Sequence, residues 1–86
     1  MILKIYIKED IVNNYEDLNE GKSIDALIVQ AIGFLVDIID ISSEHSTEND
    51  CLKIICTLDN NSDDINLDDI EEELCNYIDI YKVSLI

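Results

Sequence analysis

An excess of acidic residues constrains this chain more than any other feature. Its 86 residues include 20 Asp or Glu but only five Lys and no Arg, which gives a net charge of -15 at neutral pH. Yet 48% of the residues are hydrophobic, too many for a disordered acidic tail. The charge must therefore sit on the surface of a folded object. We expect one acidic domain spanning residues 1–86, with a modest core.

Three segments have the composition or alternation of β-strands. Leu3, Ile5 and Ile7 alternate with polar or aromatic neighbours over the first eight residues, which predicts an opening strand. Residues 51–58 repeat the pattern, and residues 78–86 are rich in β-branched and aromatic side chains. The chain is therefore predicted to form three strands.

Three other segments have helical spacing. Residues 9–20 predict a short amphipathic helix, and residues 67–76 predict another with Asn66 as its N-cap. The strongest helical pattern runs from residue 23 to about 43 and has a wide apolar arc. The polar residues 42–50 predict a loop.

This order, β-α-α-β-α-β, predicts a small α/β or α+β fold with a single three-stranded sheet covered by helices. Strands separated by helices favour parallel pairing through right-handed crossovers. The element order is loosely similar to that of barstar-type ribonuclease inhibitors, although no motif residues are shared. The wide arc of helix 23–43 predicts burial by the sheet or, alternatively, a homodimer formed through this helix.

Negative charge is densest near the last predicted helix. Five carboxylates within residues 68–73 correspond to about one charge per 1.8 Å of helix axis, close to the roughly 1.7 Å of duplex DNA. The strands instead hold four of the five lysines, as expected for edge protection or local ion pairing. Tyr6 lies on the lysine side of the first strand and is expected to be exposed, whereas Tyr77 and Tyr81 are expected to pack. The candidate partner-binding residues are Asp63, Asp64, Asp68, Asp69, Glu71, Glu72, Glu73 and Tyr6.

No pattern in the chain indicates catalysis, a metal or a cofactor. Residues 59–64 begin like a calcium-binding loop, but Asp64 stands where that loop requires Gly and Ile70 where it requires Glu. The single histidine, His45, and three cysteines without CxxC spacing do not form a recognisable zinc or nucleophile motif. The sequence therefore favours a protein that is not an enzyme.

The net charge limits the kinds of partner that the protein can bind, and the cysteine count indicates the compartment in which it works. A surface this acidic repels nucleic acid and anionic membranes, so we expect a basic protein partner that normally binds nucleic acid. The leading hypothesis is a small inhibitor that occupies a basic groove by charge mimicry, similar in character to phage anti-CRISPR and anti-restriction proteins. The alternatives are an immunity or antitoxin protein against a basic nuclease toxin, and an acidic oligomerising scaffold. The odd cysteine count and the lack of a leader-like start predict a cytoplasmic protein, in the host cell if phage-encoded.

Overall fold

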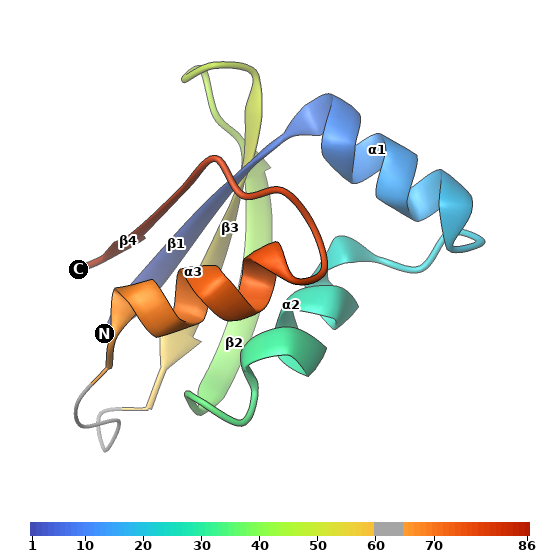
Figure 1. Ribbon diagram of the computed structural model, residues 1–86. Helices are drawn as coiled ribbons and strands as arrows, with labels where there is room; N and C mark the ends of the chain where they lie inside the picture. The colour runs from blue at the N-terminus through green and yellow to red at the C-terminus, as the bar shows by residue number, and fades with distance from the viewer. Residues whose placement is uncertain (60–64) are drawn as a thin grey trace.

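The computed structural model describes residues 1–59 and 65–86 and has an α+β fold (Figure 1). In this part of the chain, three helices accompany a four-stranded antiparallel sheet. The elements, in chain order, are β1 (Ile2–Lys8), α1 (Glu9–Leu18), α2 (Ile24–Ile32), β2 (Ile38–His45), β3 (Cys51–Leu58), α3 (Leu67–Cys75) and β4 (Lys82–Leu85).

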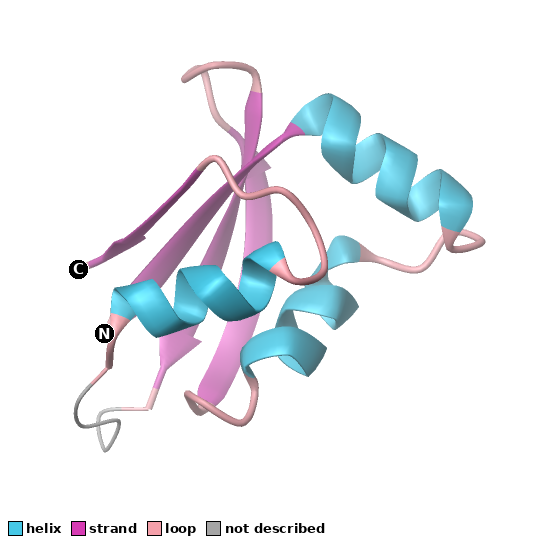
Figure 2. Cartoon of the chain, in the orientation of Figure 1, coloured by secondary structure: helices cyan, strands magenta, loops and turns pink. Residues whose placement is uncertain are grey.

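The sheet has the strand order β2-β3-β1-β4, and every neighbouring pair is antiparallel (Figure 2). Ile5 of β1 lies opposite Ile54 of β3 and Val83 of β4, which fixes the register at the centre. The predictions of three strands and of parallel pairing are therefore wrong. The additional strand, β2, makes the chain reverse once more before β3, so that β3 runs opposite to β1.

The additional strand, β2, begins inside the segment predicted as one helix from residue 23 to 43 and ends beyond it, at His45. Helix α2 ends at Ile32, and Gly33 is its C-cap. Beyond it, Ile38, Ile39 and Ile41 are β-branched residues that prefer extended backbone. Pairing with β3 buries part of Ile38 and Ile41, while a bulge leaves Ile39 outside the register and 67% exposed. Long-range pairing thus overrides the local helical pattern.

The other elements follow the sequence more closely. The predicted caps are confirmed: Ser23 Oγ accepts the Asp25 amide at 3.0 Å, and Asn66 Oδ1 accepts the Asp68 amide at 2.9 Å. Helix α1 ends at Leu18, and β4 is shorter than the strand predicted for residues 78–86. The loop predicted for residues 42–50 is wrong in its first part, which belongs to β2.

The core lies between one face of the sheet and helices α2 and α3. Leu3, Ile5 and Ile7 of β1 point into it and are completely buried, as the alternation predicts. Ile28 of α2 and Leu74 of α3 are equally buried from the helical side. Figure 1 shows both helices on the same face of the sheet, while α1 projects beyond its end. One face of the sheet is therefore covered by α2 and α3, whereas the other face is not covered by either helix.

Candidate functional site

Helix α3 presents an acidic outer face. Ile70 and Leu74 are buried against the core, so the opposite side of the helix faces solvent. This side carries four exposed carboxylate side chains, those of Asp68, Asp69, Glu71 and Glu72, which we call the α3 acidic face. Glu73 lies at the flank of the helix and is half-buried. Asp63 and Asp64, also predicted for this site, lie outside the described residues.

The carboxylates of the α3 acidic face have no cationic partner in the described part of the chain. The ion pairs found there join Glu44 to Lys53 and Glu48 to Lys82, and Glu9 contacts the imidazole of His45. The face thus presents its charge directly to solvent or to a partner.

This arrangement is unfavourable for an isolated helix. Asp68 lies one turn before both Glu71 and Glu72, and like charges at this spacing destabilise a helix by about 0.2–0.5 kcal/mol per pair. Asp68 and Asp69 interact favourably with the positive end of the helix dipole, but Glu72 lies near the negative end. The last turn contains no basic residue to offset it. The charge of Glu71 and Glu72 therefore does not serve the stability of the helix.

The open face of the sheet has a different composition. No helix covers it among the described residues, and four of the five lysines project from its strands: Lys4 and Lys8 from β1, Lys53 from β3 and Lys82 from β4. We call this surface the lysine face. Lys53 Nζ lies 2.7 Å from a carboxylate oxygen of Glu44 on β2. This pair, and that of Lys82 with Glu48, agree with the local-pairing alternative for two of the four strand lysines.

Tyr6 lies in the middle of the lysine face but is not exposed. Its ring is flanked across the sheet by Lys53 and Lys82, and Lys82 Nζ lies 4.7 Å above the ring centroid. The aliphatic parts of such lysines can cover an aromatic ring, and Tyr6 is only 9% exposed. The prediction that Tyr6 is exposed is therefore wrong. Because Tyr6 occupies the central strand β1, the lysines of both neighbouring strands close over it.

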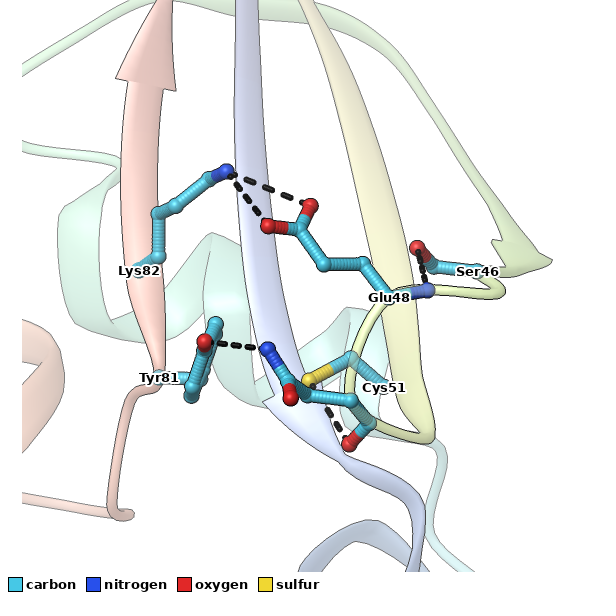
Figure 3. Close-up of polar contacts among 6 residues, drawn as sticks. Ser46, Glu48, Cys51, Tyr81 and Lys82 are labelled. Carbon is cyan, nitrogen blue, oxygen red and sulfur yellow. Dashed lines mark hydrogen bonds and ion pairs between the residues drawn. The ribbon is translucent and has the colours of Figure 1, made fainter.

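Tyr77 and Tyr81 were expected to pack against the rest of the fold, but both are exposed. Tyr81 immediately precedes β4 and takes part in a contact network with the turn between β2 and β3 (Figure 3). Asn49 donates a side-chain hydrogen bond to the Tyr81 hydroxyl, and Lys82 Nζ lies 3.3 Å from Glu48. Lys8 Nζ adds a bond of 2.7 Å to the Asn49 carbonyl oxygen. The turn is thereby fixed over the lysine face.

Two thiols are buried on opposite faces of the sheet. Cys56 belongs to the core, and burial raises its pKa to about 12. Cys51 lies opposite Lys8 on the lysine face, where burial again raises the thiol pKa. Both thiols are therefore protonated at neutral pH, and a thiolate nucleophile is disfavoured at either position. His45 pairs with Leu52 in the sheet register, and its Nδ1 hydrogen-bonds with the Glu9 carboxylate.

The described residues contain neither a metal-binding cluster nor a membrane-spanning helix. No three His, Cys, Asp or Glu side chains come together there as a metal-binding group. Within residues 1–59 and 65–86, no helix combines the length and apolar character needed to cross a membrane.

Comparisons with known proteins give no family. No protein-family model, no curated protein and no solved structure matches this chain. The geometry of the two faces therefore carries the functional argument.

Proposed function

We propose that this protein is a small acidic inhibitor that binds a basic groove of a nucleic-acid-binding protein through its α3 acidic face. The observation that carries the proposal is the unpaired charge of that face, four exposed carboxylates without a cation in the described residues. A groove lined by Lys and Arg would supply the missing cations and release the repulsion within the helix.

Such a partner would normally hold DNA or RNA in the groove. The helix brings its carboxylates to a linear density close to that of duplex phosphates, so it competes for the same cations. This activity suits a cytoplasmic phage anti-defence protein acting on a restriction or CRISPR nuclease in the host cell. Neutralisation of a basic nuclease toxin uses the same face and is the alternative within this class.

The test is competition with nucleic acid. Purified protein is added to a panel of restriction, CRISPR and toxin nucleases, and cleavage is measured at low and high salt. We expect inhibition of at least one enzyme, weakening as salt rises. Inhibition of a toxin nuclease alone would identify the immunity alternative. Inhibition that does not change with salt would contradict the groove-binding model.

A matched pair of variants locates the inhibitory surface. The first carries Asp68→Asn, Asp69→Asn, Glu71→Gln and Glu72→Gln, which removes the charge of the α3 acidic face. The second carries Asp10→Asn, Asp17→Asn, Glu20→Gln and Asp79→Asn, which removes four exposed charges elsewhere. We expect only the first to lose inhibition. Equal loss in both variants would mean that net charge, rather than this face, is responsible.

A second candidate function is an oligomerising scaffold. The residues between 29 and 39 include four exposed apolar side chains, Val29, Phe34, Leu35 and Ile39. These side chains belong to the wide apolar arc of segment 23–43, and the packing of α2 and β2 leaves them exposed. Sedimentation equilibrium tests this candidate: a homodimer that Phe34→Ser converts to a monomer would support it. A monomer at all concentrations would rule it out.

A further inference from the structure

A cavity of about 220 Å³ lies between helix α1 and the adjacent ends of β2 and β3. Its lining residues are Glu9, Val12, Asn13, Glu16, His45 and Leu52. Glu9 and Glu16 are seven residues apart on α1, and Val12 and Asn13 lie between them on the same side of the helix. The cavity therefore combines one helix face with one end of the sheet.

The lining has a defined chemical pattern. Val12 is buried and Leu52 is half-buried, so both offer apolar surface. The carboxylates of Glu9 and Glu16 lie toward opposite ends, because seven residues of α-helix span about 10 Å. Glu9 already contacts His45, so the carboxylate open to a cation is that of Glu16. The apolar surface beside it matches a ligand with an aliphatic stem and a cationic head.

Negative charge around Glu16 is incompletely balanced. Glu16 Oε2 accepts the Ile24 amide at 3.3 Å, which brings it close to the start of α2. There, one oxygen of Asp25 is buried without a hydrogen-bond partner among the described residues. Burial, and then the charge of Glu16, raise the pKa of Asp25. A cation bound at Glu16 would offset this charge.

We propose that this cavity receives an arginine side chain of the basic partner. The inference rests on the proposed function only in taking the partner to be a basic protein. Arginine fits better than lysine because its planar guanidinium can form paired hydrogen bonds with a carboxylate while its stem contacts Val12 and Leu52. A buried arginine of this kind is a common energetic centre of protein interfaces.

The test uses the isolated protein and a defined probe. N-acetyl-arginine amide is titrated while methyl NMR signals of Val12 and Leu52 are followed. We expect saturable shifts with a dissociation constant on the order of 1–10 mM. The neutral citrulline analogue keeps the shape and should give no saturable shift, and the lysine analogue should bind more weakly. Absence of saturation with arginine, or equal shifts with citrulline, would overturn the inference.

Variants test whether the lining carboxylates hold the probe. Glu9→Gln with Glu16→Gln preserves acceptors for His45 and Ile24 but removes both charges, and should weaken binding at least tenfold. Asp10→Asn with Asp17→Asn removes the same charge from exposed positions of α1 outside this cavity and should leave the affinity within twofold. Equal weakening by both pairs would show nonspecific attraction and overturn the inference.

The α3 variant separates this inference from the proposed function. Neutralising the α3 acidic face should leave probe binding intact, because none of its residues lines the cavity. If that variant loses nuclease inhibition while the wild-type cavity fails to bind arginine, only the inference fails. If the cavity binds arginine while the variant inhibits normally, the proposed function fails and the cavity site remains.

Discussion

The lysine face and the α3 acidic face differ in whether their charged side chains form ion pairs within the molecule. On the lysine face, Lys53 is paired with Glu44 and Lys82 with Glu48, and Lys82 also covers Tyr6. On the α3 acidic face, the carboxylates repel one another and have no cationic partner in the described part of the chain. Charge on the sheet side is therefore part of the folded structure, whereas charge on the helix side is available to a partner. Each prediction below tests this contrast.

The largest effect should come from the inner side of α3. Ile70→Ala or Leu74→Ala should lower the free energy of unfolding by about 2–5 kcal/mol, because both side chains are almost completely buried. Urea unfolding followed by circular dichroism measures the loss. A change below about 0.5 kcal/mol would mean that α3 is not anchored by these residues, and that its acidic face is not held in a fixed orientation.

The sequence predicted α3 well because local signals determine it. Asn66 supplies the cap, Ile70 and Leu74 the apolar side, and the acids the outer side, all within a few residues of one another. The segment predicted as helix 23–43 failed because its second half pairs with β3, about fifteen residues further along the chain. Its apolar residues fit either periodicity, and only the presence of the partner strand decides between them.

Neutralising carboxylates on the outer side of α3 should have an intermediate effect and should raise the stability of the fold instead of lowering it. Glu71→Gln with Glu72→Gln removes three like-charge pairs with Asp68 and Asp69, each costing about 0.2–0.5 kcal/mol. The variant should therefore unfold at a higher temperature than the wild type, and added sodium chloride should stabilise it less. Differential scanning calorimetry at low and high salt measures both.

Removing two carboxylate charges that form ion pairs with lysines of the lysine face should instead lower the stability of the fold. Glu44→Gln with Glu48→Gln removes the same charge but breaks the pairs with Lys53 and Lys82. This variant should unfold at a lower temperature than the wild type. If both double variants were stabilised alike, global self-repulsion would outweigh local pairing, and the contrast between the faces would fail.

A smaller effect should appear in the pH dependence of the Glu44–Lys53 pair. The hydrogen bond and the charge of Lys53 lower the pKa of Glu44 below 4.5, and the hydrogen bond that Lys53 donates to Glu44 raises the pKa of Lys53 above 10.5. The pair therefore stabilises the fold between these limits; the contribution is lost as pH falls through the folded pKa of Glu44 or rises through that of Lys53. The stability difference between wild type and Glu44→Gln should be complete at pH 7 and should shrink steadily as pH falls below 4.5. A difference that does not shrink on acidification would show that the charge of Glu44 is not its source.

The candidate surfaces were less predictable than the helices. Alternation placed Tyr6 correctly beside the lysines, but its burial depends on Lys53 and Lys82 from two strands distant in sequence. The α1 cavity did have a local signal, since Glu9 and Glu16 share one helix face with Val12. Its apolar wall at Leu52 comes from β3, and only the tertiary fold brings the two together.

The smallest effect should come from Asp25, on the helix side of the molecule. Its folded pKa is raised above 3.8, first by burial and then by the charge of Glu16, so ionisation of Asp25 disfavours the folded state. Stability linked to its protonation is complete below pH 3.8 and is lost as pH rises through the folded pKa. Asp25→Asn should therefore stabilise the protein at pH 7, by less than about 0.5 kcal/mol, and have no such benefit at pH 3. Thermal melts at both pH values measure the difference.

Destabilisation at pH 7 would mean that attraction between Asp25 and the α2 dipole outweighs the repulsion from Glu16. The helix side would then hold one acid that stabilises the fold, and its contrast with the lysine face would be confined to α3.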